Sequence, residues 1–211
     1  MSNYKLEIKN LSKIFGQRII FQNINYSIHS NFVLGISGSN GSGKSTLVKI
    51  IAGVLSPTKG HVNHFVNGEK IDYEKLFNFI GFVSPYLILY EEFSAEENLK
   101  IISKIRGIKY EAEYIKELLA KMNLYSRRKD IVKTYSSGMK QRLKFIFALM
   151  HRPNLLILDE PTSNLDNEGK ESVYSIIKDY SLKNIVIIAS NEEQDLAHCN
   201  EILFLEKYKS Q

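Results

Sequence analysis

The chain has 211 residues, of which 44% are hydrophobic, and its formal net charge at pH 7 is +5. This apolar fraction can build a core, which excludes a mainly disordered chain, and the single cysteine, Cys199, excludes a disulfide-stapled secreted scaffold. Without a signal-peptide pattern or an apolar run of about 20 residues, the sequence predicts a soluble cytoplasmic protein, and its small basic excess either solubilises the surface or favours polyanionic partners.

The first third of the chain reads as strands around one helix. Alternating apolar residues predict strands at Tyr4–Ile8 and Arg18–Ile28. The mostly apolar run Phe32–Ser37 suits a strand buried on both faces of a parallel sheet. Helical spacing follows over Thr46–Leu55, and the pair at 67–68, Asn-Gly, predicts a hairpin.

The middle of the chain is helical. Ser94 and Glu97 have the spacing of a capping box, which predicts a helix from there to about Arg106. Periodic apolar residues predict two more helices over Glu111–Met122 and Gly138–His151. We expect these helices to form a lobe inserted over about residues 94–150.

Strands and helices alternate again after residue 153. The expected order is strand, helix, strand, short helix, strand, over Leu155–Leu158, Asn167–Tyr180, Ile185–Ala189, Glu192–Ala197 and Ile202–Leu205. Such alternation with apolar strands predicts an α/β fold with a parallel sheet. We therefore expect one domain over residues 1–211, with a core of 1–93 and 151–211 around the helical lobe.

A glycine-rich loop between the strand at 32–37 and the following helix matches the phosphate-loop pattern G-x-x-x-x-G-K-[ST]. Glycines let backbone N–H groups approach phosphate oxygens, and the helix N-terminus adds its dipole. Lys44 would place its charge on the β- and γ-phosphates, and the Ser45 hydroxyl would ligate Mg²⁺. The alternative is a glycine-rich turn that matches by chance. The predicted ATP-binding residues of this loop are Gly38, Ser39, Asn40, Gly41, Ser42, Gly43, Lys44, Ser45 and Thr46.

Two acidic residues follow the apolar run at 155–158. Because ligands bind at the carboxyl ends of parallel strands, Asp159 and Glu160 should point toward the phosphate loop. Asp159 would reach the Mg²⁺ beside Ser45, and Glu160 is the candidate general base for the attacking water. The alternative is that both acids only end the strand and cap the next element.

A second short motif makes a family visible. Tyr135-Ser136-Ser137-Gly138-Met139-Lys140-Gln141-Arg142 precedes Asp159-Glu160-Pro161-Thr162 and follows the phosphate loop. This order resembles the ATPase subunit of the ATP-binding cassette (ABC) transporters over essentially the whole chain. The resemblance implies a P-loop NTPase with a RecA-like parallel sheet, an N-terminal antiparallel β region and the inserted helical lobe.

The resemblance also implies roles for residues outside the phosphate loop. Phe15 would stack on adenine, unless it is an ordinary core or surface aromatic. Asp166 would form part of a D-loop across a dimer interface, a role compatible with capping the helix that starts near Asn167. Two subunits would bind head to tail with two ATPs between them. Each ATP would meet the signature of the other subunit, at Ser136, Ser137, Gly138 and Met139.

Four positions depart from the family pattern. Tyr135 and Ser137 replace the usual leucine and first glycine of the signature, and Pro85 stands where the family usually has glutamine. Asn191 stands where the family usually has a histidine that contacts the γ-phosphate, and none of the five histidines falls there. An amide donates a hydrogen bond but cannot carry a positive charge. We therefore expect hydrolysis that depends on Glu160 and Asn191, with a slow basal rate.

The resemblance implies an ATP-hydrolysing subunit that energises a separate membrane permease and lies on the cytoplasmic face of the membrane. The aromatic segment Tyr86–Phe93 would be the docking surface, unless its side chains form a small core under the lobe. The alternative function is an ATP-driven dimerisation switch with little or no hydrolysis. Family members that act on ribosomes or DNA are usually longer, so no nucleic-acid partner is expected, and a small-molecule kinase would have no use for the signature.

Overall fold

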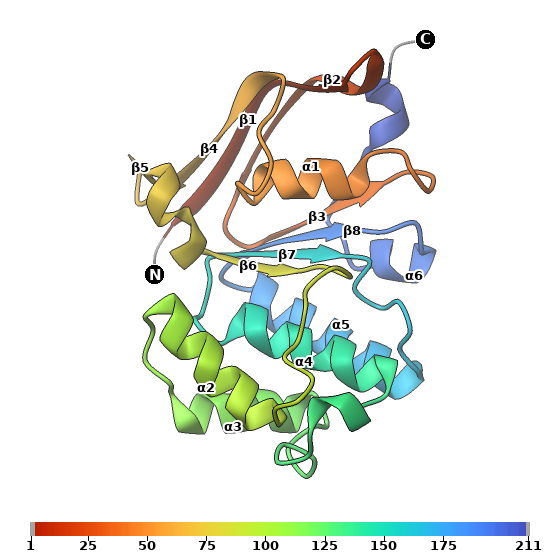
Figure 1. The fold of residues 1–211 in the computed structure, drawn as a ribbon. Helices are drawn as coiled ribbons and strands as arrows, with labels where there is room; N and C mark the ends of the chain where they lie inside the picture. Colours follow the sequence, from red (N-terminus) through yellow and green to blue (C-terminus); the bar gives the residue numbers. More distant parts are fainter. Residues whose placement is uncertain (1–2, 210–211) are drawn as a thin grey trace.

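The computed structural model describes residues 3–209, which form two β-sheets with helices between and below them (Figure 1). The first sheet is antiparallel and has the order β2-β1-β4-β5. Its strands are β1 (Tyr4–Phe15), β2 (Arg18–His29), β4 (Lys59–Val66) and β5 (Glu69–Lys70). Asn67 and Gly68 connect β4 to β5 with positive φ angles of 52° and 86°, so the predicted hairpin is confirmed.

The second sheet is parallel throughout and has the order β6-β7-β8-β3-β9. Its strands are β3 (Phe32–Ser37), β6 (Ile80–Val83), β7 (Leu155–Asp159), β8 (Ile185–Ala189) and β9 (Glu201–Phe204). The predicted α/β class, with a parallel sheet and an N-terminal antiparallel region, is confirmed.

Helices cover both faces of the parallel sheet. Helix α1 (Lys44–Ile51) lies between the two sheets, whereas α4 (Ser137–Leu149) and α5 (Asn167–Ser181) cover the opposite face. Below α4 lie α2 (Ala95–Arg106) and α3 (Ala112–Lys121). The short elements are α6 (Glu193–Leu196) and the 3-10 helices Tyr73–Asn78, Val132–Thr134 and Leu205–Tyr208.

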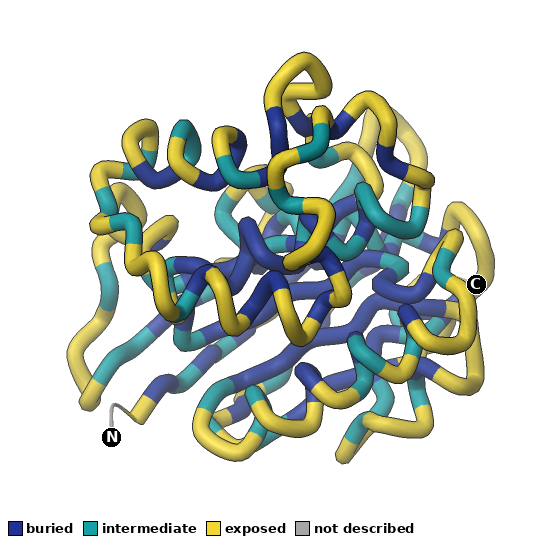
Figure 2. The backbone as a smooth tube through the Cα atoms, turned by 90° about the horizontal axis from the view of Figure 1, so that it is seen from below, coloured by how far each residue is buried: buried dark blue, intermediate teal, exposed yellow. Residues whose placement is uncertain are grey.

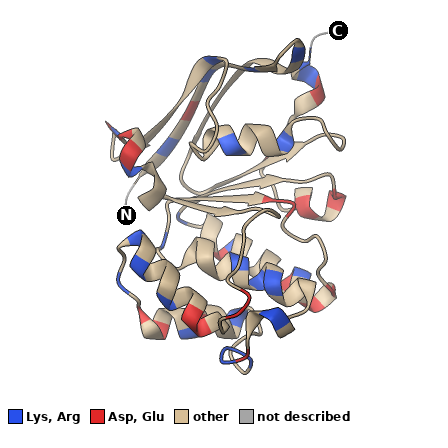
Figure 3. Cartoon of the chain, in the orientation of Figure 1, with Lys and Arg blue, Asp and Glu red and all other residues tan. Residues whose placement is uncertain are grey.

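Each face of the parallel sheet has its own hydrophobic core. Leu155 and Ile157 of β7 point into the core with α1, while Leu156 and Leu158 point into the core with α4 and α5. Figure 2 shows the central strands as buried and the outer helices as alternating buried and exposed turns. In Figure 3 the charged residues gather on the helices and loops around these strands. This burial explains why the strand sequences are apolar without alternation.

The helix predicted over Thr46–Leu55 runs instead from Lys44 to Ile51. It ends early because Gly53 has a left-handed φ of 74°, and the N–H groups of Val54 and Leu55 turn back to the Lys49 carbonyl. By contrast, the predicted capping box is confirmed: Ser94 and Glu97 exchange side-chain and backbone hydrogen bonds at the start of α2.

Helix α4 packs directly on β6. The two elements approach closely because Gly81 has no side chain: a Cβ atom there would lie 2.3 Å from the Ala148 carbonyl oxygen. The last part of the segment predicted as a lobe therefore covers the sheet, and the division into core and lobe stays a prediction. Within residues 3–209, no helix combines the length and the apolarity that crossing a membrane requires.

Candidate functional site

The glycine-rich loop connects the carboxyl end of β3 to the first turn of α1. Gly43 immediately precedes the helix with a φ of 111°, and a Cβ atom there would lie 2.4 Å from Cγ2 of Ile20. Gly41 also has a positive φ, of 75°, but faces open space. The loop therefore needs glycine at position 43 for both backbone conformation and close packing, and at 41 for conformation alone.

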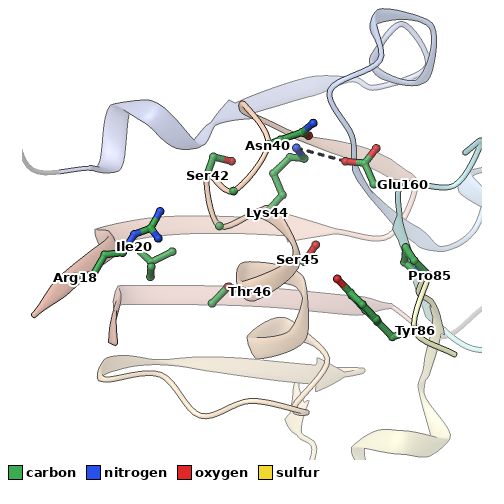
Figure 4. A pocket seen from close by; sticks show the side chains of 12 residues that line it. Arg18, Ile20, Asn40, Ser42, Lys44, Ser45, Thr46, Pro85, Tyr86 and Glu160 are labelled. Carbon is green, nitrogen blue, oxygen red and sulfur yellow. Dashed lines mark ion pairs between the residues drawn. The ribbon is translucent and has the colours of Figure 1, made fainter. Parts of the chain in front are cut away.

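Lys44 holds its charge inside this loop. Although the residue is only 5% exposed, its ammonium has two oxygen partners. Nζ donates a hydrogen bond to the Gly38 carbonyl at 2.8 Å and lies 3.4 Å from Oε1 of Glu160 (Figure 4). The cation and the candidate base thus lie side by side, as the phosphate-binding interpretation requires.

Ser45 and Asp159 meet at the carboxyl end of β7. The Ser45 hydroxyl donates to Oδ1 of Asp159 at 3.0 Å, while the buried Oδ2 has no hydrogen-bond partner among the described residues. Burial raises the pKa of Asp159, against smaller opposing effects of the Ser45 hydrogen bond and of the Lys49 and Lys44 charges. Mg²⁺ prefers hydroxyl, carboxylate and phosphate oxygens. A buried carboxylate oxygen without a partner, beside a serine hydroxyl, fits that ion.

Glu160 follows the strand in a strained conformation. Its φ of 49° is unusual for a residue with a side chain, and its N–H donates to the Ala189 carbonyl of β8 at 2.9 Å. Burial raises the pKa of the Glu160 carboxyl, and the Lys44 charge opposes this. The turn directs the carboxylate toward the phosphate loop, where a general base would meet a bound water.

Lys44, Ser45 and Glu160 line one pocket of about 370 Å³, and Asp159 lies behind Ser45. Its lining residues are Arg18, Ile20, Asn40, Gly41, Ser42, Gly43, Lys44, Ser45, Thr46, Pro85, Tyr86 and Glu160. Figure 4 shows Arg18 and Ile20 at one end, and Ser45, Tyr86 and Glu160 toward the other. Gly38 and Ser39 form the base of the loop, where the Ser39 N–H donates to Oε1 of Glu206 at 2.7 Å. The elongated pocket suits a nucleotide with its phosphates at the Lys44 end.

Other predicted site residues lie outside this lining. Phe15 is half exposed at the end of β1, with the Lys13 ammonium 4.6 Å from its ring centre. Asn191 is exposed one residue beyond the buried Ser190 that follows β8. In the described part of the chain, the β2 residues Arg18 and Ile20 line the pocket instead of Phe15. The roles of Phe15 and Asn191 stay predictions.

The signature residues stand at the start of α4. Ser136 is the N-cap and accepts a hydrogen bond from the Met139 N–H at 3.2 Å, while Ser137 is exposed in the first turn. Gly138 packs close to the loop that precedes Asp166, because a Cβ atom there would lie 3.1 Å from the Asn164 carbonyl oxygen. Asp166 caps α5 by accepting from the Gly169 N–H at 2.9 Å. The predicted N-cap role of Asp166 therefore holds, and its role at an interface stays a prediction.

A buried carboxylate that sequence reasoning missed lies behind Glu160. Asp195 of α6 is 1% exposed and accepts three hydroxyl hydrogen bonds. The donors are Thr162 at 2.8 Å, Tyr174 at 2.9 Å and Ser190 at 2.7 Å. Ser190 Oγ also lies 3.4 Å from Oε2 of Glu160. In the sequence, Asp195 ends an acidic run that reads as a solvated helix, so no local signal separates it from its neighbours.

Comparison with known proteins agrees with this geometry. The family model "ABC transporter" matches residues 21–163. A lantibiotic transport ATP-binding protein of Streptococcus pyogenes, SrtF, is 37% identical over 186 residues, which cover 88% of this chain and 79% of that protein. A bacitracin transport ATP-binding protein of Enterococcus faecalis, BcrA, is 30% identical over 202 residues, which cover 95% of this chain and 65% of that protein. A putative ABC transporter ATP-binding protein of Pyrococcus furiosus has a solved structure with a TM-score of 0.83 at 29% identity, covering 98% of this chain and 100% of that one. The chain therefore belongs to the ABC transporter family, as one of its ATP-binding proteins.

Proposed function

We propose that this chain is the ATP-hydrolysing subunit of an ABC transporter, acting as a head-to-tail dimer on a separate membrane permease. The observation that carries the proposal is that Lys44, Ser45 and Glu160 line one pocket, with Glu160 Oε1 3.4 Å from Lys44 Nζ and the Asp159 carboxylate hydrogen-bonded to Ser45. The transport functions named for the relatives support it, and they do not favour a switch without hydrolysis.

Different residues of the site bind the phosphates, hold the metal ion and accept the proton during hydrolysis. The loop amides and Lys44 bind the β- and γ-phosphates, and Ser45 and Asp159 would hold a Mg²⁺, which neutralises phosphate charge when bound. Glu160 accepts a proton from the water whose oxygen attacks the γ-phosphorus, and the bond to the β–γ bridging oxygen breaks to release ADP. Asn191 would donate its amide hydrogen to the transferred phosphate without adding charge. We therefore expect Asn191→His to raise the basal rate.

The signature is suited to an ATP held by another subunit. It lies at the N-terminus of α4, where free N–H groups and the helix dipole bind anions. Ser136 and Ser137 are exposed there and belong to none of the walls of the chain's own phosphate pocket. A head-to-tail pairing would bring these groups to the second subunit's phosphates.

Apolar side chains in the segment beside α4 support docking on a permease. In the segment 86–93, Ile88, Tyr90 and Phe93 are exposed, whereas Leu89 is buried and Tyr86 lines the nucleotide pocket. Beside it lies an apolar groove of about 320 Å³. Its lining residues are Ala52, Val54, Phe77, Ile80, Phe82, Leu87, Ile102, Arg106, Phe147 and Ala148. An apolar segment of the permease would bury these side chains.

We further propose that the complete transporter moves an antibiotic of the classes for which SrtF and BcrA are named, lantibiotics or bacitracin. Deleting the gene should lower the minimal inhibitory concentration of at least one of these compounds. Restoring the Glu160→Gln variant should not rescue resistance, whereas restoring the parent should. Unchanged sensitivity to both compounds in the deletion strain would contradict this assignment.

The composite site is tested by mixing two inactive variants. Lys44→Ala disables the phosphate loop, and Ser137→Glu places a carboxylate in the signature at a helix position where an acid does not harm folding. A mixed dimer of the two keeps one intact site, so the mixture should hydrolyse ATP although each variant alone does not. The parent alone gives the reference rate for two intact sites, because any mixture that contains the parent also contains parent homodimers. An inactive mixture beside an active reference would contradict the head-to-tail arrangement.

A further inference from the structure

The wall of the nucleotide pocket opposite the phosphate loop is formed by Pro85 and Tyr86, just after β6. Pro85 offers neither a side-chain donor nor an N–H. The Tyr86 side chain extends into the pocket, and Figure 4 shows its hydroxyl pointing toward Ser45. With 73% of the residue exposed, this ring is not part of a core. A polar group aimed at the metal end of the pocket is therefore available for a ligand.

Lys49 holds the Tyr86 ring in this position. It stands one helical turn beyond Ser45 on α1, and its ammonium lies 4.8 Å from the ring centre. The charge of the same ammonium opposes the rise that burial causes in the pKa of Asp159. The ring thus lies beside Ser45 in the pocket, and a cation–π contact at an exposed site is weak enough to let it adjust when a nucleotide enters.

The segment that carries Tyr86 is also tied to the signature helix. Lys144 of α4 donates to the Pro85 carbonyl at 2.7 Å, and Lys140 of α4 lies 2.6 Å from Glu91. Lys133 lies 3.1 Å from Glu92. A displacement of Tyr86 by a bound ligand would therefore be transmitted through one short segment to the exposed side chains at 88–93 and to the helix that begins at the signature.

We propose that Tyr86 is a nucleotide-contacting residue, whose hydroxyl hydrogen-bonds the phosphate or metal-bound-water end of Mg-ATP. A phenol hydroxyl can donate to a phosphate oxygen or accept from a metal-bound water. The inference rests on the proposed function for the identity of the ligand, but it needs only binding and not hydrolysis.

A tryptophan reporter tests the contact directly, because the sequence contains no tryptophan. Tyr86→Trp would carry the only indole of the chain. The matched control is Tyr90→Trp, on the same segment but outside the pocket lining. Mg-ATP and Mg-ADP should change the fluorescence of Tyr86→Trp by much more than that of Tyr90→Trp. Equal responses of the two variants would indicate movement of the whole segment and would overturn the contact. The contact would also be overturned if Tyr86→Trp gave no response at a concentration where equilibrium dialysis shows bound ATP.

Removing the hydroxyl alone gives a second test. A hydrogen bond to a charged group contributes about 1.5–3 kcal/mol, so Tyr86→Phe should raise the Kd of Mg-ATP about tenfold or more. Tyr90→Phe should leave the Kd unchanged, and neither variant should change the melting temperature because both rings are exposed. A parent-like Kd in Tyr86→Phe would overturn the proposal. A parent chain that binds ATP without hydrolysing it would contradict the proposed function and leave this test valid.

Discussion

The two faces of the parallel sheet carry different kinds of functional group. On the face with α1 and the antiparallel sheet, Lys44, Ser45 and Glu160 are in contact within one chain. On the face with α4, the signature at Ser136 and the aromatic segment at 86–93 are exposed. The groups on the first face are therefore assembled by folding of the chain alone, whereas those on the second face are exposed and can contact another protein. Variants on the two faces should differ accordingly.

The largest effect is expected at Lys44. Replacing it with alanine removes the cation that meets both Gly38 and Glu160 in the loop. Loss of one preorganised donor to developing charge costs about 10²–10³-fold in rate. We expect ATP hydrolysis by Lys44→Ala to fall by at least this factor in a steady-state phosphate-release assay. A melting temperature close to that of the parent would show that the variant is folded and has lost only its hydrolysis rate. Hydrolysis near the parent rate would contradict a role of the phosphate loop in the reaction.

Acid should weaken both cores through one histidine each. Burial lowers the pKa of His64 to about 4 in the core with α1, and lowers that of His151 to about 4 beside α4. The unfolded state binds the proton more tightly than the folded state. The contribution of each neutral histidine to the free energy of unfolding is therefore fully present above about pH 6.5 and is lost as pH falls toward 4. The loss is on the order of 2–3 kcal/mol each.

Urea unfolding at pH 7 and pH 5 measures this effect. His64→Gln and His151→Gln should each show a smaller drop in unfolding free energy between the two pH values than the parent. If only one variant does so, acid acts on one face alone. A parent with equal stability at both pH values would contradict the linkage.

A smaller effect is expected at the start of α2. The Ser94 hydroxyl accepts from the Glu97 N–H at 3.2 Å, and the Ser94 N–H donates to the Glu97 carboxylate at 2.8 Å. Loss of an N-cap costs about 1 kcal/mol, which lowers the melting temperature of a chain this size by about 2–4 °C. Scanning calorimetry of Ser94→Ala checks this, with Ser172→Ala on α5 as control. ATP affinity should stay at the parent value, since α2 lies on the other face.

The smallest effect on stability is expected at the Lys140–Glu91 ion pair, whose atoms are 2.6 Å apart. Pairs at this level of exposure contribute at most about 1 kcal/mol and are screened by salt. A double-mutant cycle with Lys140→Ala and Glu91→Ala, measured by urea unfolding at low and high ionic strength, should give a coupling energy that disappears at high salt. A coupling that persists there would mean that the segment is anchored by packing.

The parts predicted from the sequence are those set by short-range spacing. The phosphate loop, the Asp159–Glu160 pair and the caps of Ser94 and Asp166 each involve residues a few positions apart. Their hydrogen bonds form within one strand–loop–helix unit, so the pattern alone indicates them. The fold class followed from the same units, because alternating strands and helices build a parallel sheet.

The remaining site residues depend on strand order, which no local pattern contains. Arg18 from β2 and Tyr86 from the end of β6 reach the pocket because α1 lies between the two sheets. Asp195 meets Thr162 and Ser190 because β7 and β8 are neighbours. The role of Phe15 as the adenine contact, which the resemblance implies, stays a prediction: its half-exposed ring lies at the end of β1, outside the pocket lining.

The most direct test of the account is steady-state hydrolysis of Mg-ATP by Glu160→Gln beside the parent. General-base catalysis contributes about 10²–10⁴-fold, and the amide keeps the size of the side chain without accepting the proton. We expect the parent to hydrolyse ATP and Glu160→Gln to lose at least about 10²-fold in rate while its ATP affinity stays within a few-fold. Equal rates for the two proteins would contradict Glu160 as the base and the assignment of this pocket as the hydrolytic site.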